Sequence, residues 1–342
     1  MMKIEENISL KAFNTFGINA ISRYFSGFNS RSELEECLLA AVKNGITNKD
    51  QILILGGGSN MLFTRDYPGF VLKNQVKGIE VVKQDEQYVY LKAGAGENWH
   101  QFVLYCIDHE LAGVENLSLI PGNVGASPMQ NIGAYGVEIK DVFHELEAFH
   151  LEDKSVITFT KEDCHFGYRE SIFKKKHKGE FVILSVTFRL NKIPEFKISY
   201  GAIEQELEKM TINKLSIQAI STAVINIRSS KLPDPAVIGN AGSFFKNPVI
   251  TTALFEALRK KYPAIPGYPS AEGVKLAAGW MIEQCGWKGY RSGDAGCHEK
   301  QALVLVNYGN ATGKEIYALS QLIANSVKEK FKVDLEREVN II

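Results

Sequence analysis

Hydrophobic and polar positions in the first half of the chain follow the period of β-strands. Residues 52–55 form an apolar run typical of a buried strand, and residues 79–93 alternate around a polar centre, which predicts a hairpin. A second hairpin is expected over 143–160 and a strand rich in β-branched residues over 181–190. The first part of the chain is therefore predicted to be rich in strands.

Two helices are predicted among these strands. The first is expected over 32–44, because Ser32 and Glu35 have the spacing of a capping box and Gly45 follows the last apolar position. Its buried face is expected to consist of Leu34, Leu38, Ala41 and Val42. The second helix is expected over 98–110.

The pattern changes after residue 191, where Pro194 lies in a polar linker. From there the sequence indicates helices over 201–230, 251–262, 271–285 and 312–331, with strands near 302–307 and 335–341. We therefore expect a mixed α+β protein with a boundary between 191 and 215.

Composition and charge exclude several classes of protein. The 342 residues carry 39 basic and 39 acidic side chains, which argues against a generally basic nucleic-acid coat. The five cysteines include no C-x-x-C pair, so neither a disulfide framework nor a metal site is predicted. The acidic N-terminus lacks the apolar segment of a signal peptide, and no stretch reaches the roughly 18 apolar residues of a membrane span. A soluble cytoplasmic protein is expected.

Two local clusters have a functional reading and a simpler one. The basic run 174–178 beside Phe173 could contact nucleic acid, but in a chain of zero net charge a solvated loop is the expected reading. Cys297-His298 could form a nucleophile and base, but adjacent side chains seldom face each other, and Cys164-His165 repeats the pair elsewhere. Both are expected to be structural.

The first glycine cluster, 56–60, follows the predicted strand 52–55. Glycine leaves backbone N–H groups free to converge on phosphate oxygens, so this turn is a candidate phosphate cradle. It lacks the Gly-Lys-Ser/Thr ending of a P-loop, and Met61 replaces the third glycine of a dinucleotide-binding fingerprint. Taken alone, an ordinary turn is the alternative.

The second cluster, 120–138, is a long glycine-rich segment without periodicity whose one charged side chain is Glu138. Loops of this length in compact domains are usually functional or disordered, and the apolar residues here argue against disorder. The segment is expected to line a ligand channel with its backbone.

The third cluster, 239–248, contains Ser243 ahead of two aromatic residues. It is not a hydrolase elbow, because Ala241 and Phe245 stand where G-x-S-x-G needs glycine. The neighbouring aromatics could shield the hydroxyl from water. A turn or capping serine is the alternative.

Taken together, seven motifs resemble the UDP-N-acetylenolpyruvoylglucosamine reductase family, also called UDP-N-acetylmuramate dehydrogenases. They follow one another in order over essentially the whole chain. The motifs are Asn14-Thr15-Phe16-Gly17, residues 56–60, Ile120-Pro121-Gly122 through Gly136-Val137-Glu138, Tyr168-Arg169-Glu170-Ser171, Lys231-Leu232-Pro233-Asp234-Pro235, residues 239–248 and Leu335-x-x-Glu338-Val339.

The resemblance implies an FAD-binding fold of the vanillyl-alcohol-oxidase/PCMH-like class in two lobes, followed by a C-terminal α+β substrate domain. The corresponding ranges are 1–70 for the first lobe, 71–191 for the second and 192–342 for the substrate domain. FAD is expected to be non-covalent, because Ser59-Asn60 stands where covalent relatives carry a histidine. The residues implied to bind it are Gly56, Gly57, Gly58, Ser59, Asn60, Pro121, Gly122, Gly125, Ala126, Ser127, Gln130, Gly133 and Gly136.

The implied reaction reduces the enolpyruvyl group of UDP-N-acetylglucosamine enolpyruvate to give UDP-N-acetylmuramate, for peptidoglycan synthesis. NADPH reduces FAD, and the reduced flavin delivers hydride to the terminal carbon of the substrate. Negative charge then develops at the carbon beside the carboxylate. Such a transition state needs cations or hydrogen-bond donors and a proton donor.

The resemblance implies that Arg169 and Glu338 polarise the intermediate and that Ser243 donates the proton. A guanidinium suits this role because it stays charged and binds carboxylates through two hydrogen bonds. A surface salt bridge is the alternative for Arg169. Glu336 would share a strand face with Glu338, so only the Glu-Val match selects Glu338.

The remaining implied roles concern the substrate. The residues expected to contact it are Tyr168, Tyr200, Lys231, Asn247 and Gln301. Tyr200 lies in 196–201, which resembles the lid insertion of the family's longer branch. A monomer without nucleic-acid or membrane partners is expected. The alternatives are a flavin- or nucleotide-binding module with a decayed centre and, more distantly, an oxidase of the same flavin fold that acts on a small alcohol.

Overall fold

The chain forms two compact units, each built from segments that are separate in the sequence. The computed structural model describes residues 3–200 and 202–342. Unit 1 contains the residues up to Ile8 together with 22–58 and 67–230, and unit 2 contains 9–21, 59–66 and 231–342. The three-part division predicted above stays a prediction.

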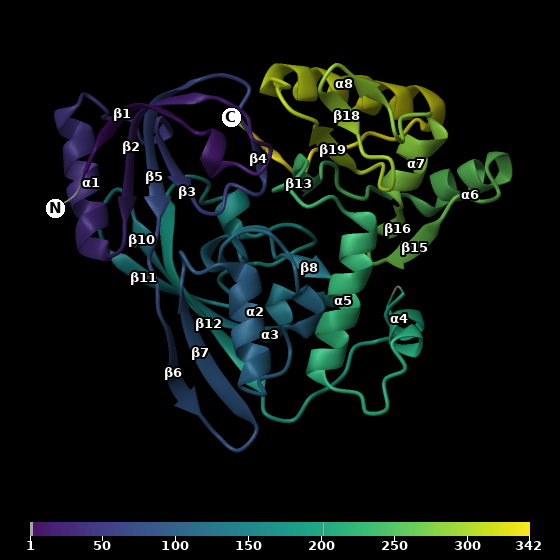
Figure 1. The fold of residues 1–342 in the computed structure, drawn as a ribbon, viewed down its shortest axis with the longest axis horizontal. Coiled ribbons are helices and arrows are strands. Elements are labelled where there is room, and N and C mark those ends of the chain that lie inside the picture. The colour runs from purple at the N-terminus through teal and green to yellow at the C-terminus, as the bar shows by residue number, and fades with distance from the viewer. Residues whose placement is uncertain (1–2, 201) are drawn as a thin grey trace. The chain divides into compact units, whose positions relative to one another are not determined.

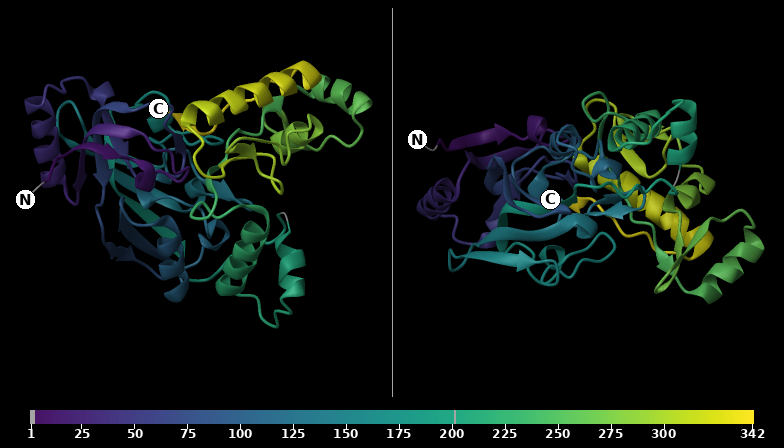
Figure 2. Two further views of the ribbon diagram at one scale, coloured as in Figure 1. Left: turned by 45° about the horizontal axis from the view of Figure 1, so that its top comes forward. Right: turned by 90° about the horizontal axis from the view of Figure 1, so that it is seen from below.

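The first sheet of unit 1 has four strands in the order β1-β2-β5-β3 (Figure 1). They are β1 (Glu5–Ser9), β2 (Ile21–Phe28), β3 (Ile52–Leu55) and β5 (Tyr67–Asn74). The central strand β5 pairs in parallel with both β2 and β3. Helix α1 (Arg31–Lys43) lies beside these strands (Figure 2) and buries its apolar face against Phe70 and Leu72. The predicted strand 52–55 is thus confirmed.

Helix α1 is confirmed, but its predicted cap was wrong. Ser30 is the N-cap, because its side chain accepts a hydrogen bond from the Glu33 N–H, and the Glu33 carboxylate accepts one from the Asn29 N–H at 2.7 Å. This is the Ser-x-x-Glu spacing of a capping box, two residues earlier than expected. Val42 was also misassigned, since it is 59% exposed.

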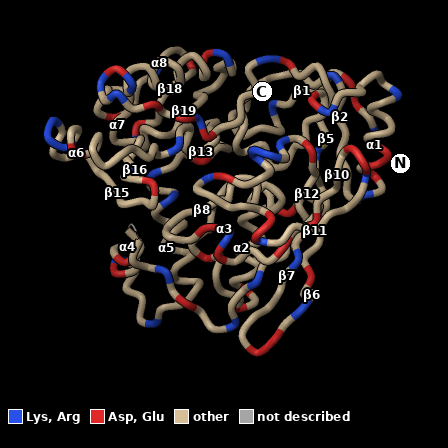
Figure 3. The backbone as a smooth tube through the Cα atoms, turned by 180° about the vertical axis from the view of Figure 1, so that it is seen from behind, with Lys and Arg blue, Asp and Glu red and all other residues tan. Residues whose placement is uncertain are grey.

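The second sheet of unit 1 is antiparallel, in the order β11-β10-β12-β7-β6. It consists of β6 (Ile79–Gln84), β7 (Tyr88–Gly94), β10 (Phe143–His150), β11 (Val156–Thr160) and β12 (Phe181–Asn191). Both predicted hairpins and the strand 181–190 are confirmed. Acidic residues mark the tip of the β6–β7 hairpin (Figure 3), where the Asp85 carboxylate accepts from the backbone N–H groups of Gln87 and Tyr88.

Helix α2 (Trp99–Asp108) packs on this second sheet and confirms the helix predicted near 98–110. The rings of Trp99 and Phe102 contact Phe188 of β12 with centroid distances of 5.8 and 4.8 Å. Each of the three side chains is at most 1% exposed. Fully burying aromatic rings of this size contributes several kcal/mol, about 1.5–3 kcal/mol for each ring.

The segment 120–138 is irregular in unit 1, as expected. It contains the 3₁₀ turn η4 (Val124–Ala126) and the short strands β8 (Gly133–Ala134) and β9 (Val137–Glu138), and α3 (Ile139–Val142) follows it. Further 3₁₀ turns are η2 (Lys49–Gln51), η3 (Glu115–Leu117) and η5 (Ile172–Lys174). The helix predicted over 201–230 is two helices, α4 (Ile203–Lys209) and α5 (Ile217–Lys231), because the chain turns between them at Thr211 with φ +53°.

The two larger sheets of unit 2 are ordered β13-β19-β18-β17 and β14-β16-β15. The strands are β13 (Gly239–Ser243), β14 (Val249–Ile250), β15 (Gly267–Ser270), β16 (Gly273–Leu276), β17 (Arg291–Ser292), β18 (Ala295–Cys297) and β19 (Val304–Asn307). The helices are η1 (Lys11–Phe13), α6 (Thr252–Lys261), α7 (Ala278–Gln284) and α8 (Gly313–Phe331), the long yellow helix of Figure 2.

Two predictions for unit 2 were partly wrong. Residues 273–276 form strand β16 rather than the start of a helix, because they pair with β15 in a hairpin. The strand expected over 335–341 is reduced to β20 (Asn340–Ile341), which pairs in parallel with β4 (Met61–Leu62). The helix over 312–331 is confirmed, and its capping box joins Thr312 and Glu315. Within the described ranges, no helix has the length and apolarity needed to cross a membrane.

Candidate functional site

Two glycine-rich turns of unit 1 meet backbone to backbone. A Cβ atom at Gly57, just after β3, would lie 2.7 Å from the Cα of Gly122 and 3.0 Å from the Asn123 amide oxygen. Real side chains do not approach that closely, so only glycine fits at position 57. The following residue, Gly58, has φ +64°, which also favours glycine.

A third turn packs against the same segment. Gly122 O accepts from the Trp99 N–H at 3.0 Å, and the Asn123 side chain donates to Gly96 O at 3.1 Å. A Cβ at Gly125 would lie 2.5 Å from the Cβ of Ala95. These turns therefore meet mainly through backbone along the junction of 56–58 with 122–125. The glycines there carry no side chains, so the backbone of 56–58 and 122 is open to the close approach of a ligand such as the pyrophosphate and flavin of FAD.

The predicted cofactor residues are divided between the two units. Ser59 and Asn60 belong to unit 2, and all the others belong to unit 1. Ser127 is 1% exposed and its hydroxyl donates to Val124 O at 2.7 Å, so its side chain closes the η4 turn. Pro121 and Ala126 are exposed at the edge of the same loop.

Arg169 occupies a strained position in a tight turn of unit 1. Gly167 and Glu170 exchange backbone hydrogen bonds of 3.0 and 3.3 Å, which leaves Tyr168 and Arg169 at the tip. Arg169 has φ +57°, a conformation that costs about 1–2 kcal/mol for a residue with a Cβ. Its guanidinium donates to Gly133 O at 2.6 Å and lies 5.5 Å from the Tyr168 ring centroid. Strain of this kind concentrates at functional sites.

Two residues to which the sequence assigned no role, Asn131 and the motif residue Ser171, anchor this turn. The buried amide of Asn131 donates to Gly167 O at 3.0 Å, and the Ser171 hydroxyl donates to Met129 O at 2.6 Å. With the bond from Arg169 to Gly133, three side chains tie the turn to the glycine-rich loop. Only the position of Asn131 inside that loop could have signalled its role.

A buried cation lies beside the same loop. The Nε of Arg228, on α5, is buried without a hydrogen-bond partner in the described part of the chain, and burial lowers the pKa of this guanidinium. Burial raises the pKa of the Tyr135 phenol, an effect that the charge of Arg228 opposes. Burial also lowers the pKa of His100, and Arg228 adds to that effect. The His100 Nδ1 accepts from the Leu119 N–H at 3.0 Å, which requires the neutral ring.

Tyr200 lies next to the glycine-rich loop. Its side chain is 60% exposed, and a Cβ at Gly136 would lie 3.2 Å from the Cβ of Tyr200. Gly136 has φ +81°. The predicted substrate residue Tyr200 is therefore adjacent to a predicted cofactor residue within unit 1.

Ser243 ends strand β13 in unit 2. The strand pairs with β19 through a bulge between Asn240 and Ser243, and Gly242 inside this bulge has φ +68°. Shielding of the hydroxyl by the neighbouring aromatics was one reading of the sequence, but Ser243 is exposed while Phe244 and Phe245 are buried. The bulge explains the difference, because it turns Ser243 out of the layer that holds the rings.

Glu338 lies beside the strand end that carries Ser243. Its backbone N–H donates to Phe244 O at 2.9 Å, and its backbone carbonyl accepts from the Asn60 side chain at 3.3 Å. Glu336 takes a different role, since its carboxylate pairs with the buried Lys246 ammonium at 2.6 Å. Unit 2 therefore brings together the chain segments of Ser243, Glu338 and Asn60.

The other predicted substrate residues have these positions. Lys231 is exposed at the last turn of α5. Asn247 accepts from the Ala278 N–H at 2.9 Å and so holds the start of α7, and Gln301 accepts from the Leu303 N–H at 3.3 Å. The two amide oxygens are engaged locally.

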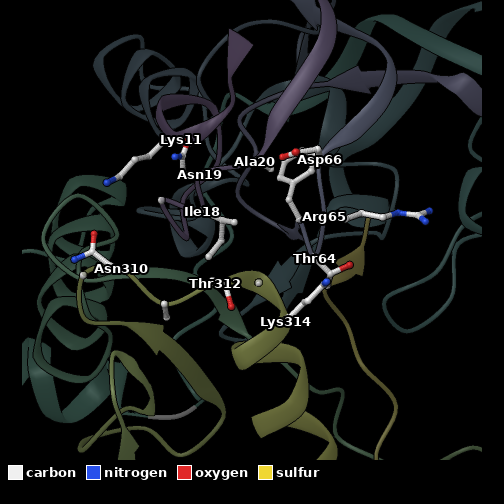
Figure 4. A pocket seen from close by; sticks show the side chains of 15 residues that line it. Lys11, Ile18, Asn19, Ala20, Thr64, Arg65, Asp66, Asn310, Thr312 and Lys314 are labelled. Carbon is white, nitrogen blue, oxygen red and sulfur yellow. The ribbon is translucent and has the colours of Figure 1, made fainter. Parts of the chain in front are cut away.

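A cavity of about 620 Å³ lies elsewhere in unit 2 (Figure 4). It is lined by residues 17–20, 63–66 and 309–314 together with Lys11. None of the predicted site residues lines it. Among the described residues, no group of three or more His, Cys, Asp or Glu side chains is arranged to hold a metal.

Comparisons with known proteins match both halves of the chain. A family model described as "FAD binding domain" matches residues 27–160, and one described as "UDP-N-acetylenolpyruvoylglucosamine reductase, C-terminal domain" matches residues 234–342. Proteins named UDP-N-acetylenolpyruvoylglucosamine reductase are similar over the full length. One from Amoebophilus asiaticus is 54% identical and one from Flavobacterium johnsoniae is 50% identical, with 100% of each chain covered.

A solved structure has the same fold. The crystal structure of UDP-N-acetylenolpyruvylglucosamine reductase from Thermus caldophilus matches with a TM-score of 0.68 at 23% identity, covering 100% of this chain and 99% of that one. Together with the two family models, this match confirms the predicted fold class, a vanillyl-alcohol-oxidase/PCMH-like FAD-binding fold with a C-terminal α+β substrate domain.

Proposed function

Because the chain belongs to the UDP-N-acetylenolpyruvoylglucosamine reductase family, we propose that Arg169, Ser243 and Glu338 carry the reduction of its substrate. The chain is an FAD-dependent oxidoreductase of peptidoglycan precursor synthesis, with NADPH as reductant. It converts UDP-N-acetylglucosamine enolpyruvate to UDP-N-acetylmuramate.

The glycine turns would hold the flavin cofactor. Gly57 and Gly122 expose their backbone where a Cβ would close the gap, and this supports their assignment. When bound, FAD accepts hydride from NADPH and supplies it to the terminal carbon of the enolpyruvyl group. The protein then has to stabilise the charge that develops beside the substrate carboxylate and to deliver a proton there.

The conformation of Arg169 is the observation that supports the proposed function most directly. A non-glycine residue at φ +57°, bonded to Gly133 O and anchored through Asn131 and Ser171, is fixed in direction by its surroundings. Such a guanidinium can bind a carboxylate or enolate with little reorganisation, and preorganised charge is the main source of transition-state stabilisation in such reactions.

Ser243 would donate the proton, and Glu338 would stabilise the charge that develops beside the substrate carboxylate. The Ser243 hydroxyl is exposed at the end of β13, so it can reach a bound substrate and protonate the carbon beside the carboxylate. Glu338, in its protonated form or through a water molecule, would donate a hydrogen bond to the same charge. Lys246 is three residues from Ser243, but its ammonium pairs with Glu336, which compensates its charge.

The substrate would be bound by Tyr168, Tyr200, Lys231, Asn247 and Gln301. The exposed Tyr200 ring beside Gly136 is placed to cover a ligand on the glycine-rich loop. Lys231 offers an exposed ammonium for the diphosphate or the carboxylate of the substrate. The proposal includes a monomer that acts in the cytoplasm, with no nucleic-acid or membrane partner.

Reduction in deuterated water tests this function. The FAD-loaded protein, NADPH and UDP-N-acetylglucosamine enolpyruvate are incubated in D₂O, and the product is analysed by mass spectrometry. A deuterium from solvent should appear on the carbon beside the carboxylate, and because a hydride carried by the flavin can exchange with solvent before transfer, the product should contain one or two carbon-bound deuterium atoms. A protein that binds FAD but consumes no NADPH with this substrate would instead support a binding module with a decayed centre.

A further inference from the structure

One buried side-chain amide joins three segments of unit 1 near Tyr200. Asn116 lies in η3 and is 1% exposed. Its Nδ2 donates to the backbone carbonyl of Tyr135 at 2.9 Å and to that of Lys197 at 2.7 Å. Both hydrogens of the amide are therefore used, one for the glycine-rich loop and one for the segment that carries Tyr200.

Both hydrogen bonds end close to the place where Tyr200 meets Gly136. Tyr135 precedes Gly136 directly, and these two residues have φ +50° and +81°. Lys197 lies three residues before Tyr200, whose Cβ is 3.2 Å from the position of a Cβ on Gly136. The Asn116 amide thus fixes the two chain segments on which this contact depends.

The turn that carries Asn116 is itself fixed. Glu115 is 2% exposed, and its carboxylate accepts from the Gly113 N–H at 2.6 Å. On the other side, the Ser118 hydroxyl donates to Glu115 O at 2.7 Å and forms a 2.8 Å hydrogen bond with Ser221 of α5. Asn116 therefore projects from a rigid support, as a positioning element requires.

We propose that Asn116 is a positioning residue that holds Tyr200 over the glycine-rich loop and so sets how tightly the substrate binds. The inference rests on the proposed role of Tyr200 in covering the substrate. It assigns to Asn116 no contact with substrate or cofactor. The proposed role depends on the two N–H donors of the Asn116 amide, because each donates to one of two carbonyl oxygens, those of Tyr135 and Lys197.

Asn116→Asp is the sharpest test, because a carboxylate has the same shape as the amide but donates no hydrogen bond. The attraction to both carbonyls becomes repulsion, so the segment 197–200 should separate from the loop. Because the bond from Asn116 holds the carbonyl of Lys197, trypsin should cleave after Lys197 about tenfold faster or more in the variant. Lowering the pH should narrow the difference between the variant and the unsubstituted protein, because a protonated carboxyl group can donate one hydrogen bond again.

Asn14→Asp is the matched control. Asn14 in unit 2 is 6% exposed, and its Nδ2 also donates to two backbone carbonyls, those of Leu10 at 2.7 Å and Ile18 at 3.0 Å. It should lose stability through the same chemistry while the rate of tryptic cleavage after Lys197 stays unchanged. Faster cleavage after Lys197 in both variants would indicate general destabilisation and would overturn the proposal. If Asn116→Asp does not fold, Asn116→Ser, which keeps one donor, replaces it.

A double-mutant cycle with Tyr200→Ala separates this inference from the proposed function. Each single variant should raise the substrate KM, by about tenfold for Asn116→Asp, and the double variant should be no worse than Tyr200→Ala alone. Additive effects on KM would show that Asn116 does not act through Tyr200. If Tyr200→Ala leaves KM unchanged, the proposed role of Tyr200 fails, and the rate of tryptic cleavage after Lys197 still decides whether Asn116 holds the segment.

Discussion

The side-chain amide of Asn60 donates a 3.3 Å hydrogen bond to the backbone carbonyl of Glu338, 278 positions later in the chain. The Asn60 carbonyl in turn accepts from the Asn340 backbone N–H at 3.1 Å and from its side chain at 2.8 Å. The turn after the glycine cluster therefore holds the final residues of the chain. The position of Glu338 therefore depends on Asn60, a residue that its motif assigned only to cofactor binding.

Asn60→Ala should accordingly impair catalysis through Glu338. We expect a loss of about 1 kcal/mol in the free energy of unfolding and a decrease of about tenfold in kcat, because the carbonyl of Glu338 loses its donor. Asn340→Ala is the control, since it removes one bond to Asn60 and leaves the bond to Glu338. Equal effects of the two variants on kcat would contradict this coupling.

Glutamine substitutions at Glu336 and at Glu338 should have different effects on stability and on kcat. Glu336 is 68% exposed, but the Lys246 ammonium with which it pairs is buried, so Glu336→Gln should cost about 1–3 kcal/mol in stability and leave kcat nearly unchanged. Glu338→Gln should decrease kcat about a hundredfold with little effect on stability. Thermal unfolding and steady-state assays distinguish them. The reverse pattern would transfer the catalytic role to Glu336.

Alanine substitutions at the neighbouring residues Gly56 and Gly57 should have different effects on FAD binding. A methyl group at Gly57 would lie 2.7 Å from the Gly122 backbone, whereas one at Gly56 would meet its nearest atom, the Asn123 Cβ, at 3.9 Å. The Gly57→Ala substitution should therefore push the two turns apart, and the variant should be purified with much less FAD. The Gly56→Ala variant should retain more FAD than the Gly57→Ala variant. The FAD content is measured as the ratio of absorbance at 450 nm to that at 280 nm. Equal FAD content would argue against close approach as the reason for glycine at position 57.

Stability should fall in mild acid. Burial lowers the pKa of His100 from its usual 6.5, and burial lowers that of His298 as well. Below about pH 6.5 the unfolded chain therefore binds more protons than the folded one, and the free energy of unfolding decreases as the pH falls. His100→Asn keeps an acceptor for the Leu119 N–H but removes the titrating ring. Urea unfolding at several pH values should show a shallower decrease in this variant than in the unsubstituted protein.

The strands and most helices could be predicted because their patterns are local. Residues 79–93 alternate around Asp85, and α8 (Gly313–Phe331) spans almost the same residues as the predicted helix 312–331. Errors arose where two readings compete. Ser30 and Ser32 both precede acidic residues at capping distance, and residues 273–276 join a hairpin that helical periodicity cannot reveal.

The site was less accessible from sequence for a different reason. Motifs identified Arg169, but its φ of +57° and its bond to Gly133 are products of tertiary structure. Asn116 and Asn131 are buried amides that satisfy backbone carbonyls of distant segments, and no periodic pattern marks such residues. The buried Arg228 on α5 was missed because a cation among helical positions is usually solvated.

The central claim is that Ser243 supplies the proton and takes no part in the reduction of the flavin. Anaerobic stopped-flow absorbance near 450 nm on the unsubstituted protein and Ser243→Ala tests it by measuring bleaching with NADPH and recovery with UDP-N-acetylglucosamine enolpyruvate. We expect equal rates of bleaching and a recovery about 10²–10⁴-fold slower in the variant. Recovery at the normal rate, or equal slowing of both phases, would contradict the assignment.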